Sequence, residues 1–230
     1  MAKLVFDKAG EHYFEAGIHK GVLFVGAPKN TIEGIPWNGL TSVAESPDGG
    51  DANDQYADNI KYLSLRGTVN YNGTIEAYTY PVEFENCLGN VGASDGMGFF
   101  TQQSIKSFSM CYISQYGNDE DGLDYSEKLH IVWNATCSPS EKTYESINDS
   151  PEAMSFSFEF DTTPLTVSTQ YKTSDGKEFK PTSHFEITKT TANAAKYNAL
   201  IDALYGTDGD NETSSHLLLP DDVLAIITNA

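Results

Sequence analysis

Basic residues are scarce in this sequence, and arginine is almost missing. The chain has 14 Lys and Arg residues against 33 Asp and Glu residues, its formal net charge is −19, and Arg66 is its only arginine. Proteins that bind DNA or RNA without sequence preference depend on clustered lysines and arginines that contact phosphate groups. The composition therefore argues against a protein that holds nucleic acid or an anionic membrane. Acidity of this kind also serves solubility alone.

Cysteines and long apolar runs are also few. Cys87, Cys111 and Cys137 are odd in number, lie far apart and include no CxxC pair, which argues against a zinc site or a complete disulfide framework. We expect them to be buried thiols in a reducing compartment. The first residues carry no apolar run of signal-peptide length, and no segment reaches the length of a membrane span. We therefore expect a soluble protein that is made in a cytoplasm.

The sequence shows no motif for catalysis or for a cofactor. Its five histidines are scattered without the spacing of metal ligands. The glycine-rich residues 89–98 lack the Lys-Ser/Thr ending of a phosphate-binding loop, so we predict a flexible loop there. The acidic runs 119–122 and 208–212 depart from the pattern of a calcium-binding loop, and no nucleophile motif is evident. We predict no enzyme, no cofactor and no metal site.

Alternation of apolar and polar residues dominates the chain. Met154, Phe156, Phe158 and Phe160 alternate with polar residues, as in a strand with one buried face. Weaker alternation or short apolar runs predict further strands at 22–25, 75–79, 108–112, 129–133 and 185–187. Asn72-Gly73 and Asp175-Gly176 predict turns. We therefore predict a mainly β fold, an antiparallel β-sandwich or open barrel.

Two helices and an apolar tail complete the expected fold. Residues 192–205 have the spacing of an amphipathic helix that ends at Gly206, and residues 81–89 fit a short helix that begins near Pro81. We assign residues 1–206 to the β domain and residues 207–230 to an acidic linker and an apolar C-terminal tail. A tail so apolar either folds back on its own domain or docks on a neighbour.

A long acidic stretch of the chain lies between two aromatic residues, Trp37 and Tyr56. The acidic run 45–54 between them predicts a long loop, at about residues 41–58, between two strands. Long loops inside a compact domain are uncommon and are usually functional or disordered. The aromatic ends favour a functional loop.

The same region resembles the major tail (tail tube) protein family of long-tailed, non-contractile bacteriophages. The segments that carry the resemblance are Trp37-Asn38-Gly39-Leu40-Thr41, Ser46-Pro47, Tyr56-Ala57-Asp58-Asn59-Ile60-Lys61-Tyr62-Leu63, the residues 74–81, Glu83-Phe84, Cys87, the residues 138–142, 147–153 and 162–164, and the ending 216–223. They extend, in order, over most of residues 30–230.

The resemblance implies a structural virion protein with the phage tail tube fold. In that family, six-membered rings stack into a tube that conducts DNA into the host, and the long loop reaches the adjacent ring. The implied partners are other copies of the chain, the tape measure, the tail terminator and the tail-tip initiator, with DNA passing through unbound and no membrane contact. The implied location is the virion tail, assembled in the bacterial cytoplasm. The first strand is expected to help join subunits. The residues expected at assembly contacts are Trp37, Glu45, Pro47, Asp48, Asp51, Asp54, Tyr56, Leu217, Leu218, Leu219 and Ile226.

Two other classes of protein remain open on the sequence. A carbohydrate-binding or receptor-binding β module would also be acidic and rich in aromatics, and Tyr78, Tyr80 or Trp133 would then stack on sugar rings. A tube protein of a secretion or contractile-injection system would share the fold and the assembly. A glycosidase is a more distant alternative, because its paired carboxylates could be chosen almost anywhere among 33 acids.

Overall fold

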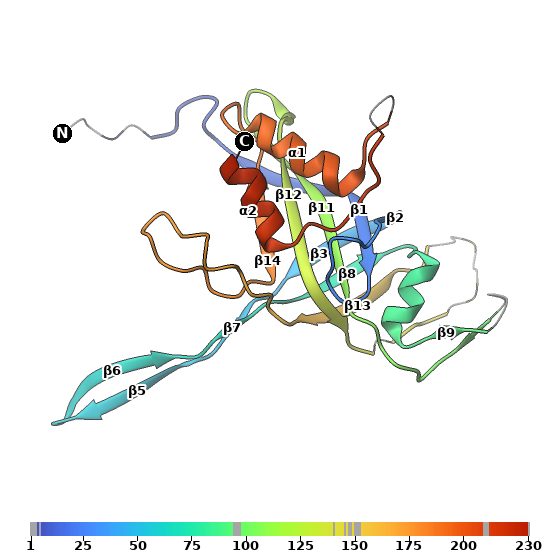
Figure 1. Cartoon of the computed structure of the whole chain (residues 1–230), viewed down its shortest axis with the longest axis horizontal. Helices are drawn as coiled ribbons and strands as arrows, with labels where there is room; N and C mark the ends of the chain where they lie inside the picture. Colours follow the sequence, from blue (N-terminus) through green and yellow to red (C-terminus); the bar gives the residue numbers. More distant parts are fainter. Residues whose placement is uncertain are drawn as a thin grey trace.

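An antiparallel sheet organises the chain (Figure 1). The computed structural model describes residue 4 and residues 6–93, 98–139, 141–144, 146, 149, 153–208 and 212–229. These residues form an eight-stranded sheet whose order is β2 (Ile35–Trp37), β1 (Phe14–Val25), β11 (Phe108–Asn118), β12 (Gly122–Cys137), β13 (Phe156–Thr162), β8 (Asn72–Ala77) and β3 (Leu40–Glu45), with β14 (His184–Thr188) paired to β12. The predicted mainly antiparallel β fold is confirmed.

The long strand β12 bends the sheet into an open barrel. Its residues 128–132 pair with β14, whereas residues 135–137 pair with β13. Asn134 lies between these two stretches with a φ of 51°, a left-handed conformation that Asn tolerates better than most residues. Its backbone N–H donates to Ser109 Oγ at 3.1 Å and its Nδ2 donates to the Thr163 carbonyl at 3.0 Å. These bonds hold the bend that turns β13, β8 and β3 back toward β1.

Two apolar cores lie on opposite faces of this sheet. The inner core fills the bend and contains Phe84, Phe108, Phe158 and Phe160. The outer core lies between the sheet and the helices α1 (Ala194–Tyr205) and α2 (Pro220–Asn229), which cover one face together (Figure 1). Because both faces of β11 and β12 are covered, the central part of these strands is buried, and most of its residues are apolar.

The strand predicted from 154–161 is present as β13, with Phe158 and Phe160 buried and Ser157 and Glu159 exposed. The turn at Asp175-Gly176 is also confirmed, because Gly176 has a φ of 78° and its N–H donates to the Thr173 carbonyl at 2.8 Å. The prediction of a turn at Asn72-Gly73 is wrong, since both residues lie within β8.

Gly73 is required by close packing inside the sheet and not by a turn. A Cβ on Gly73 would lie 2.7 Å from the Ala44 carbonyl oxygen and 2.7 Å from Cζ of Phe160. Glycine at 73 therefore makes room for a neighbouring strand and a core ring, and no positive φ is involved.

The described helices agree with the two that the sequence predicts and add a third. The short helix is the 3-10 helix η1 (Val82–Leu88), which ends at Gly89 with a φ of 75°, and α1 is the amphipathic helix. Helix α2 was not predicted. Pro220 begins it, Asp221 and Asp222 lie in its first turn, and Asp222 Oδ2 accepts a hydrogen bond from the Leu219 N–H at 3.0 Å.

The three cysteines are buried and free, as expected. Burial raises the pKa of the Cys87 and Cys111 thiols to about 12, so these thiols are unreactive at neutral pH.

A small two-stranded sheet, β9 (Val91–Gly92) paired with β10 (Phe99–Phe100), lies beside η1 (Figure 1). Part of the predicted glycine-rich loop (94–97), of the segment 140–152 and of the acidic linker (209–211) lies outside the described residues. Within the described residues, no helix combines the length and apolarity that a membrane span requires.

Candidate assembly site

A long β-hairpin projects from the sheet between β3 and β8, and we call residues 46–70 the arm (Figure 1). Its outer part is β5 (Ala52–Ala57) paired with β6 (Ile60–Arg66), and its inner part is β4 (Asp48–Gly49) paired with β7 (Val69–Asn70). At the tip, Asp58 and Asn59 have φ values of 50° and 61°, the geometry that a two-residue hairpin turn needs. The prediction of a long loop over about 41–58 is therefore wrong in form, because residues 60–66 supply a partner strand for 52–57.

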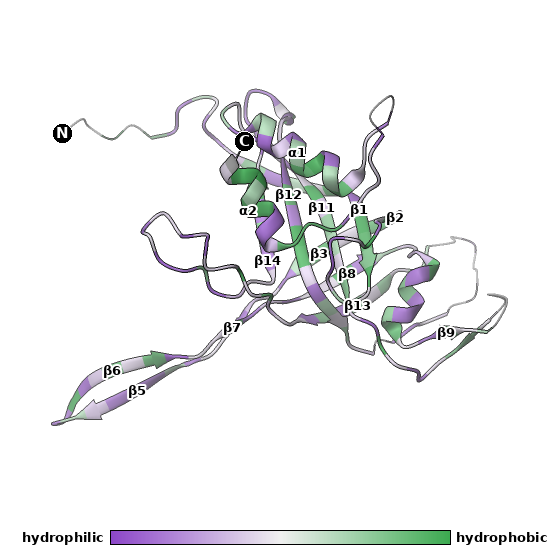
Figure 2. Ribbon diagram, viewed as in Figure 1, coloured by the Kyte–Doolittle hydropathy of each residue, from purple (hydrophilic) through white to green (hydrophobic). Residues whose placement is uncertain are grey.

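The arm exposes apolar side chains along strand β6. All residues of β6 are exposed, including Ile60 at 65%, Tyr62 at 71% and Leu65 at 58%. Figure 2 shows apolar and polar residues alternating along this strand. A two-stranded hairpin alone is marginally stable in water, and an exposed apolar strand is a template for contact with another chain. The arm therefore has the physical properties of a contact element.

The predicted contact residues of this segment lie at different places on the arm. Pro47, Asp48 and Asp51 are exposed in its inner part, and Tyr56 is 70% exposed near the tip. Asp54 lies in β5, where its Oδ1 is 2.7 Å from Lys61 Nζ, and this partner lowers the pKa of the Asp54 carboxyl. Exposed ion pairs contribute little stability. The arm is thus held mainly by its backbone pairing.

Trp37, the other predicted aromatic anchor, is part of the core. Its side chain is 3% exposed, its ring lies 4.6 Å from that of Phe84, and its Nε1 donates to the Thr79 carbonyl at 3.0 Å. Trp37 therefore ties β2 to the end of β8 inside one subunit and presents no surface to a neighbour.

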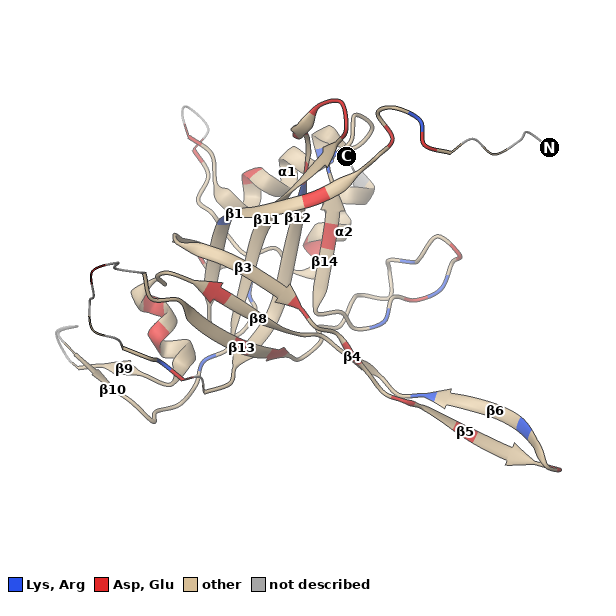
Figure 3. Ribbon diagram, turned by 180° about the vertical axis from the view of Figure 1, so that it is seen from behind, with Lys and Arg blue, Asp and Glu red and all other residues tan. Residues whose placement is uncertain are grey.

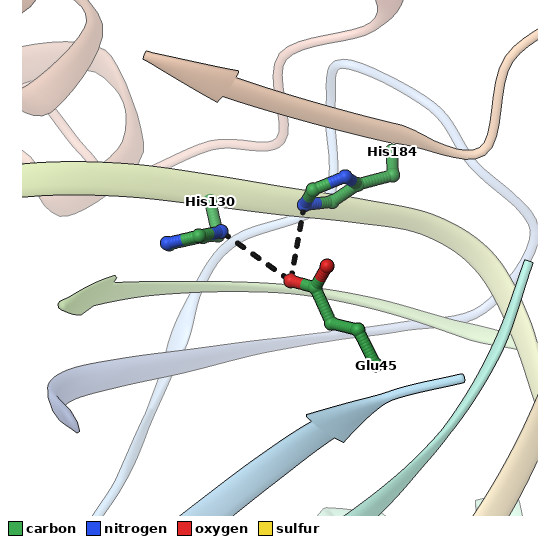
Figure 4. Close-up of side chains that lie close together, drawn as sticks. All are labelled: Glu45, His130 and His184. Atoms are coloured by element: carbon green, nitrogen blue, oxygen red, sulfur yellow. Dashed lines mark ion pairs between the residues drawn. The ribbon is translucent and has the colours of Figure 1, made fainter. Parts of the chain in front are cut away.

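Glu45, His130 and His184 come together at the root of the arm (Figure 4). Glu45 ends β3, and its Oε1 lies 3.4 Å from His130 Nδ1 on β12 and 3.5 Å from His184 Nε2 on β14. The Tyr112 hydroxyl donates to the same oxygen at 2.7 Å. Two rings flank the group: Tyr112 stacks on His130 and Tyr71 stacks on His184, each with centroids 4.7 Å apart.

This site keeps a carboxylate charged and a histidine neutral. The ring of His130 lowers the pKa of Glu45, with Tyr112 and His184 adding to the effect against burial, so that the pKa falls to about 2. Burial lowers the pKa of His184, because the charged imidazolium loses its hydration. The site therefore carries a fixed negative charge beside imidazole nitrogen atoms.

Sequence spacing gave no indication of this cluster. His130 pairs directly with Glu186 across β12 and β14, and His184 pairs with Val132, so the two histidines are diagonal neighbours on one face. Only this register and the bend of the sheet bring Glu45 to them. The histidines were predicted as scattered, and the structure corrects this for His130 and His184.

The C-terminal tail folds back on its own subunit. Leu217 and Leu218 are buried, while Leu219 and Ile226 pack against the same outer core at partial exposure. Trp133 Nε1 donates to the Leu218 carbonyl at 2.7 Å in the buried interior. Of the two alternatives for the tail, the structure shows the intramolecular one.

The exposed face of β3, β8 and β13 is polar and acidic, and Figure 3 shows acidic but no basic positions on these three strands. The register aligns Ser157 with Glu76 and Glu159 with Thr74, and Asp161 follows on the same face of β13. The carboxylates of Glu76, Glu159 and Asp161 are exposed, and these three strands contain no Lys or Arg. The face opposite the inner core therefore bears charge of one sign.

The aromatic residues considered for sugar stacking do not form a platform. Trp133 is 1% exposed and belongs to the outer core. The Tyr80 hydroxyl donates to Glu85 Oε1 at 2.9 Å and its ring packs edge-on against Phe156 and Phe158, whereas Tyr78 is 56% exposed. A stacking site that uses Trp133 is excluded.

The comparisons with known proteins agree with the resemblance in the sequence. A family model described as phage tail tube protein matches residues 29–209, which include the arm, seven of the eight sheet strands and α1. A comparison with curated protein sequences gave no match. Because the family match covers well over half of the 230 residues, and the fold is mainly antiparallel β, the chain belongs to the phage tail tube proteins.

Proposed function

We propose that this structural protein of the phage virion forms six-membered rings that stack into the tail tube, a conduit through which DNA enters the host. The observation that carries the proposal is the arm, which exposes apolar residues on a hairpin that has no core of its own. Such a strand gains stability when a neighbouring subunit covers it. We assign the arm to the contact between successive rings.

Contacts within one ring would use the ends of the sheet. In the described sheet, β3 and β2 are the terminal strands, and each pairs with a neighbour on one side only. Unpaired strand edges join readily to other strands. Pairing between the edges of adjacent subunits would make a continuous wall. The exposed start of β1, where Phe14 is 44% exposed, would add to this contact.

We assign the acidic face of β3, β8 and β13 to the channel. Six copies of a chain with a formal charge of −19 carry −114 per ring. Glu76, Glu159 and Asp161 supply negative charge to this face, and a surface without Lys or Arg offers phosphate groups no binding partner. DNA would therefore pass along the wall without being held.

Assembly would take place in the bacterial cytoplasm with other tail proteins. The tape measure, the tail terminator and the tail-tip initiator are the partners proposed for length control and for starting the tube. The buried tail residues Leu217 and Leu218 hold α2 on their own subunit, so we assign them no contact with a neighbour.

Electron microscopy of arm variants tests the proposal. Leu63 and Leu65 alternate with Ser64 and so share a face of β6, which makes the double variant Leu63→Ser/Leu65→Ser a change of polarity on one face. Gln55→Ser is the matched control, because Gln55 pairs with Leu63 across the hairpin and is polar already. Samples are viewed by negative stain over a concentration series, with mass determination and with tail-tip complexes added as initiators.

Wild type and the Gln55→Ser control are expected to give stacked hollow rings with six-fold symmetry. Burial of each leucine contributes about 1.5–3 kcal/mol, so loss of both should raise the concentration needed for tube growth by at least about tenfold. The double variant should remain folded by circular dichroism. Tubes of normal length at the wild-type concentration would refute the role of the arm, and rings of another symmetry would refute the hexamer.

A further inference from the structure

The polar cluster at the root of the arm contains buried nitrogen atoms that the fold does not satisfy. His130 is 6% exposed, and neither its Nδ1 nor Nε2 of His184 has a hydrogen-bond partner within the described part of the chain. Their distances of 3.4 and 3.5 Å to Glu45 Oε1 exceed the usual N–H···O range of about 2.7–3.2 Å. Buried polar atoms without partners are costly and need an explanation.

The spacing of these atoms fits a tetrahedral metal ion. Zinc bonds of about 2.0–2.1 Å place neighbouring ligand atoms of a tetrahedron roughly 3.4 Å apart. The distances from Glu45 Oε1 to His130 Nδ1 and to His184 Nε2, 3.4 and 3.5 Å, have this length, and all three candidate ligand atoms lie within 4.8 Å of one another. The geometry points to a zinc site formed by Glu45 Oε1, His130 Nδ1 and His184 Nε2.

The chemistry of the donors selects the ion. Two imidazole nitrogens and one carboxylate oxygen suit Zn²⁺, whereas Ca²⁺ and Mg²⁺ prefer oxygen ligands throughout. His130 also has the support that a zinc ligand needs, because its Nε2 lies 2.9 Å from Ser114 Oγ. In the tautomer whose Nε2 donates to this hydroxyl, Nδ1 carries no proton and its lone pair is free to bind a metal ion. Tyr112 orients the carboxylate in the same way.

Two of the three candidate ligands also line a cavity. Glu45 and His130 face an open cavity of about 420 Å³ between β1 and β3, from which a water molecule would supply the fourth ligand. Three protein ligands and one water molecule are a common arrangement for zinc.

The position of the site gives the metal a mechanical consequence. Glu45 is the last residue before the arm, and Tyr71, which stacks on His184, is the first residue after it. A bound ion would join the end of β3 to β12 and β14 by bonds and would thereby fix one end of the arm to the barrel, next to the ring contact of Tyr71 at the other end. The site is independent of ring formation, because all of its ligands belong to one subunit.

Metal binding to the purified full chain tests this inference. Isothermal titration with Zn²⁺ is expected to give one site per chain, and Co²⁺ is expected to give the intense visible absorption of tetrahedral coordination. Glu45→Gln keeps the shape of the side chain and an acceptor for Tyr112, so it tests the ligand without emptying the core. His184→Gln is the second variant. His12→Gln is the matched control, because His12 lies beside Asp7 and Asp119 at the surface.

Affinity for Zn²⁺ should fall at least about tenfold in Glu45→Gln and in His184→Gln and remain unchanged in His12→Gln. Zn²⁺ should also raise the melting temperature of the wild type and of the control. The inference is overturned if the wild type takes up no zinc, or if folded Glu45→Gln and His184→Gln bind zinc as the wild type does. If His184→Gln does not fold, the zinc affinity of Glu45→Gln alone decides between the two results.

Discussion

Phe158 is the residue whose removal should damage the inner core most clearly. Its side chain is fully buried, and its ring lies 5.1 Å from that of Phe84 and 5.3 Å from that of Tyr80, both at steep angles. Truncation of a buried phenylalanine to alanine costs about 3–5 kcal/mol, which combines lost burial with the cavity that remains. Edge-to-face ring pairs contribute about 0.5–1.5 kcal/mol more. Phe158→Ala should therefore lower the free energy of unfolding by at least about 3 kcal/mol.

Urea denaturation followed by fluorescence and circular dichroism measures this change, provided that both probes report one transition. For a chain of this size, a loss of about 3–5 kcal/mol corresponds to a fall in melting temperature of roughly 6–20 °C. Phe156→Ala should cost less, about 3 kcal/mol at most, because Phe156 is only partly buried. Tyr78→Ala, at a side chain 56% exposed, is the surface control and should change stability by no more than about 0.5 kcal/mol. A loss below about 1 kcal/mol for Phe158→Ala would refute the assignment of this face to the core.

Three further predictions concern the outer core, the root of the arm and the channel. Trp133→Phe should destabilise the chain by about 1–3 kcal/mol in urea titrations, because the buried Leu218 carbonyl loses its donor, and an unchanged midpoint would contradict that bond. Because the folded pKa of Glu45, about 2, lies below its ordinary value of 4.5, its stabilising effect is present above pH 4.5 and is lost as the pH falls toward 2. The difference in unfolding free energy between wild type and Glu45→Gln should shrink over that interval, and a difference that stays constant from pH 5 to pH 2 would contradict the lowered pKa. Tubes built from Glu76→Lys/Glu159→Lys should retain DNA in a salt-dependent way, and tubes that release it like the wild type would exclude this face from the channel.

The sequence was sufficient to predict an element where the spacing of apolar residues along one segment decides its secondary structure. Strict alternation over 154–161 predicted β13, and helical spacing over 192–205 predicted α1. Prediction from the sequence failed where the local structure depends on contacts between segments that are distant in the chain. Asn72-Gly73 has the composition of a turn, but the Phe160 ring and the Ala44 carbonyl that require glycine there come from other strands. The arm was missed as a hairpin because its turn is Asp58-Asn59, which lacks glycine. The polar cluster was missed because the register of β12 and β14 cannot be deduced from either strand alone.

The arm also suggests why subunits would assemble in an ordered way. A hairpin that packs no hydrophobic face against a core gains little stabilising free energy when it forms in the free subunit. Ordering its backbone costs about 1–2 kcal/mol of conformational entropy per residue. In the proposed tube, burial of Ile60, Tyr62 and Leu65 by a neighbour would offset that cost only when a ring is already present to receive the arm. On the proposed arrangement a first ring would have no such receiver, so starting a tube should be slow and adding to one should be fast. A tail-tip complex that presents a receiving surface would remove the slow step, and tube growth from the purified chain should then begin without a lag.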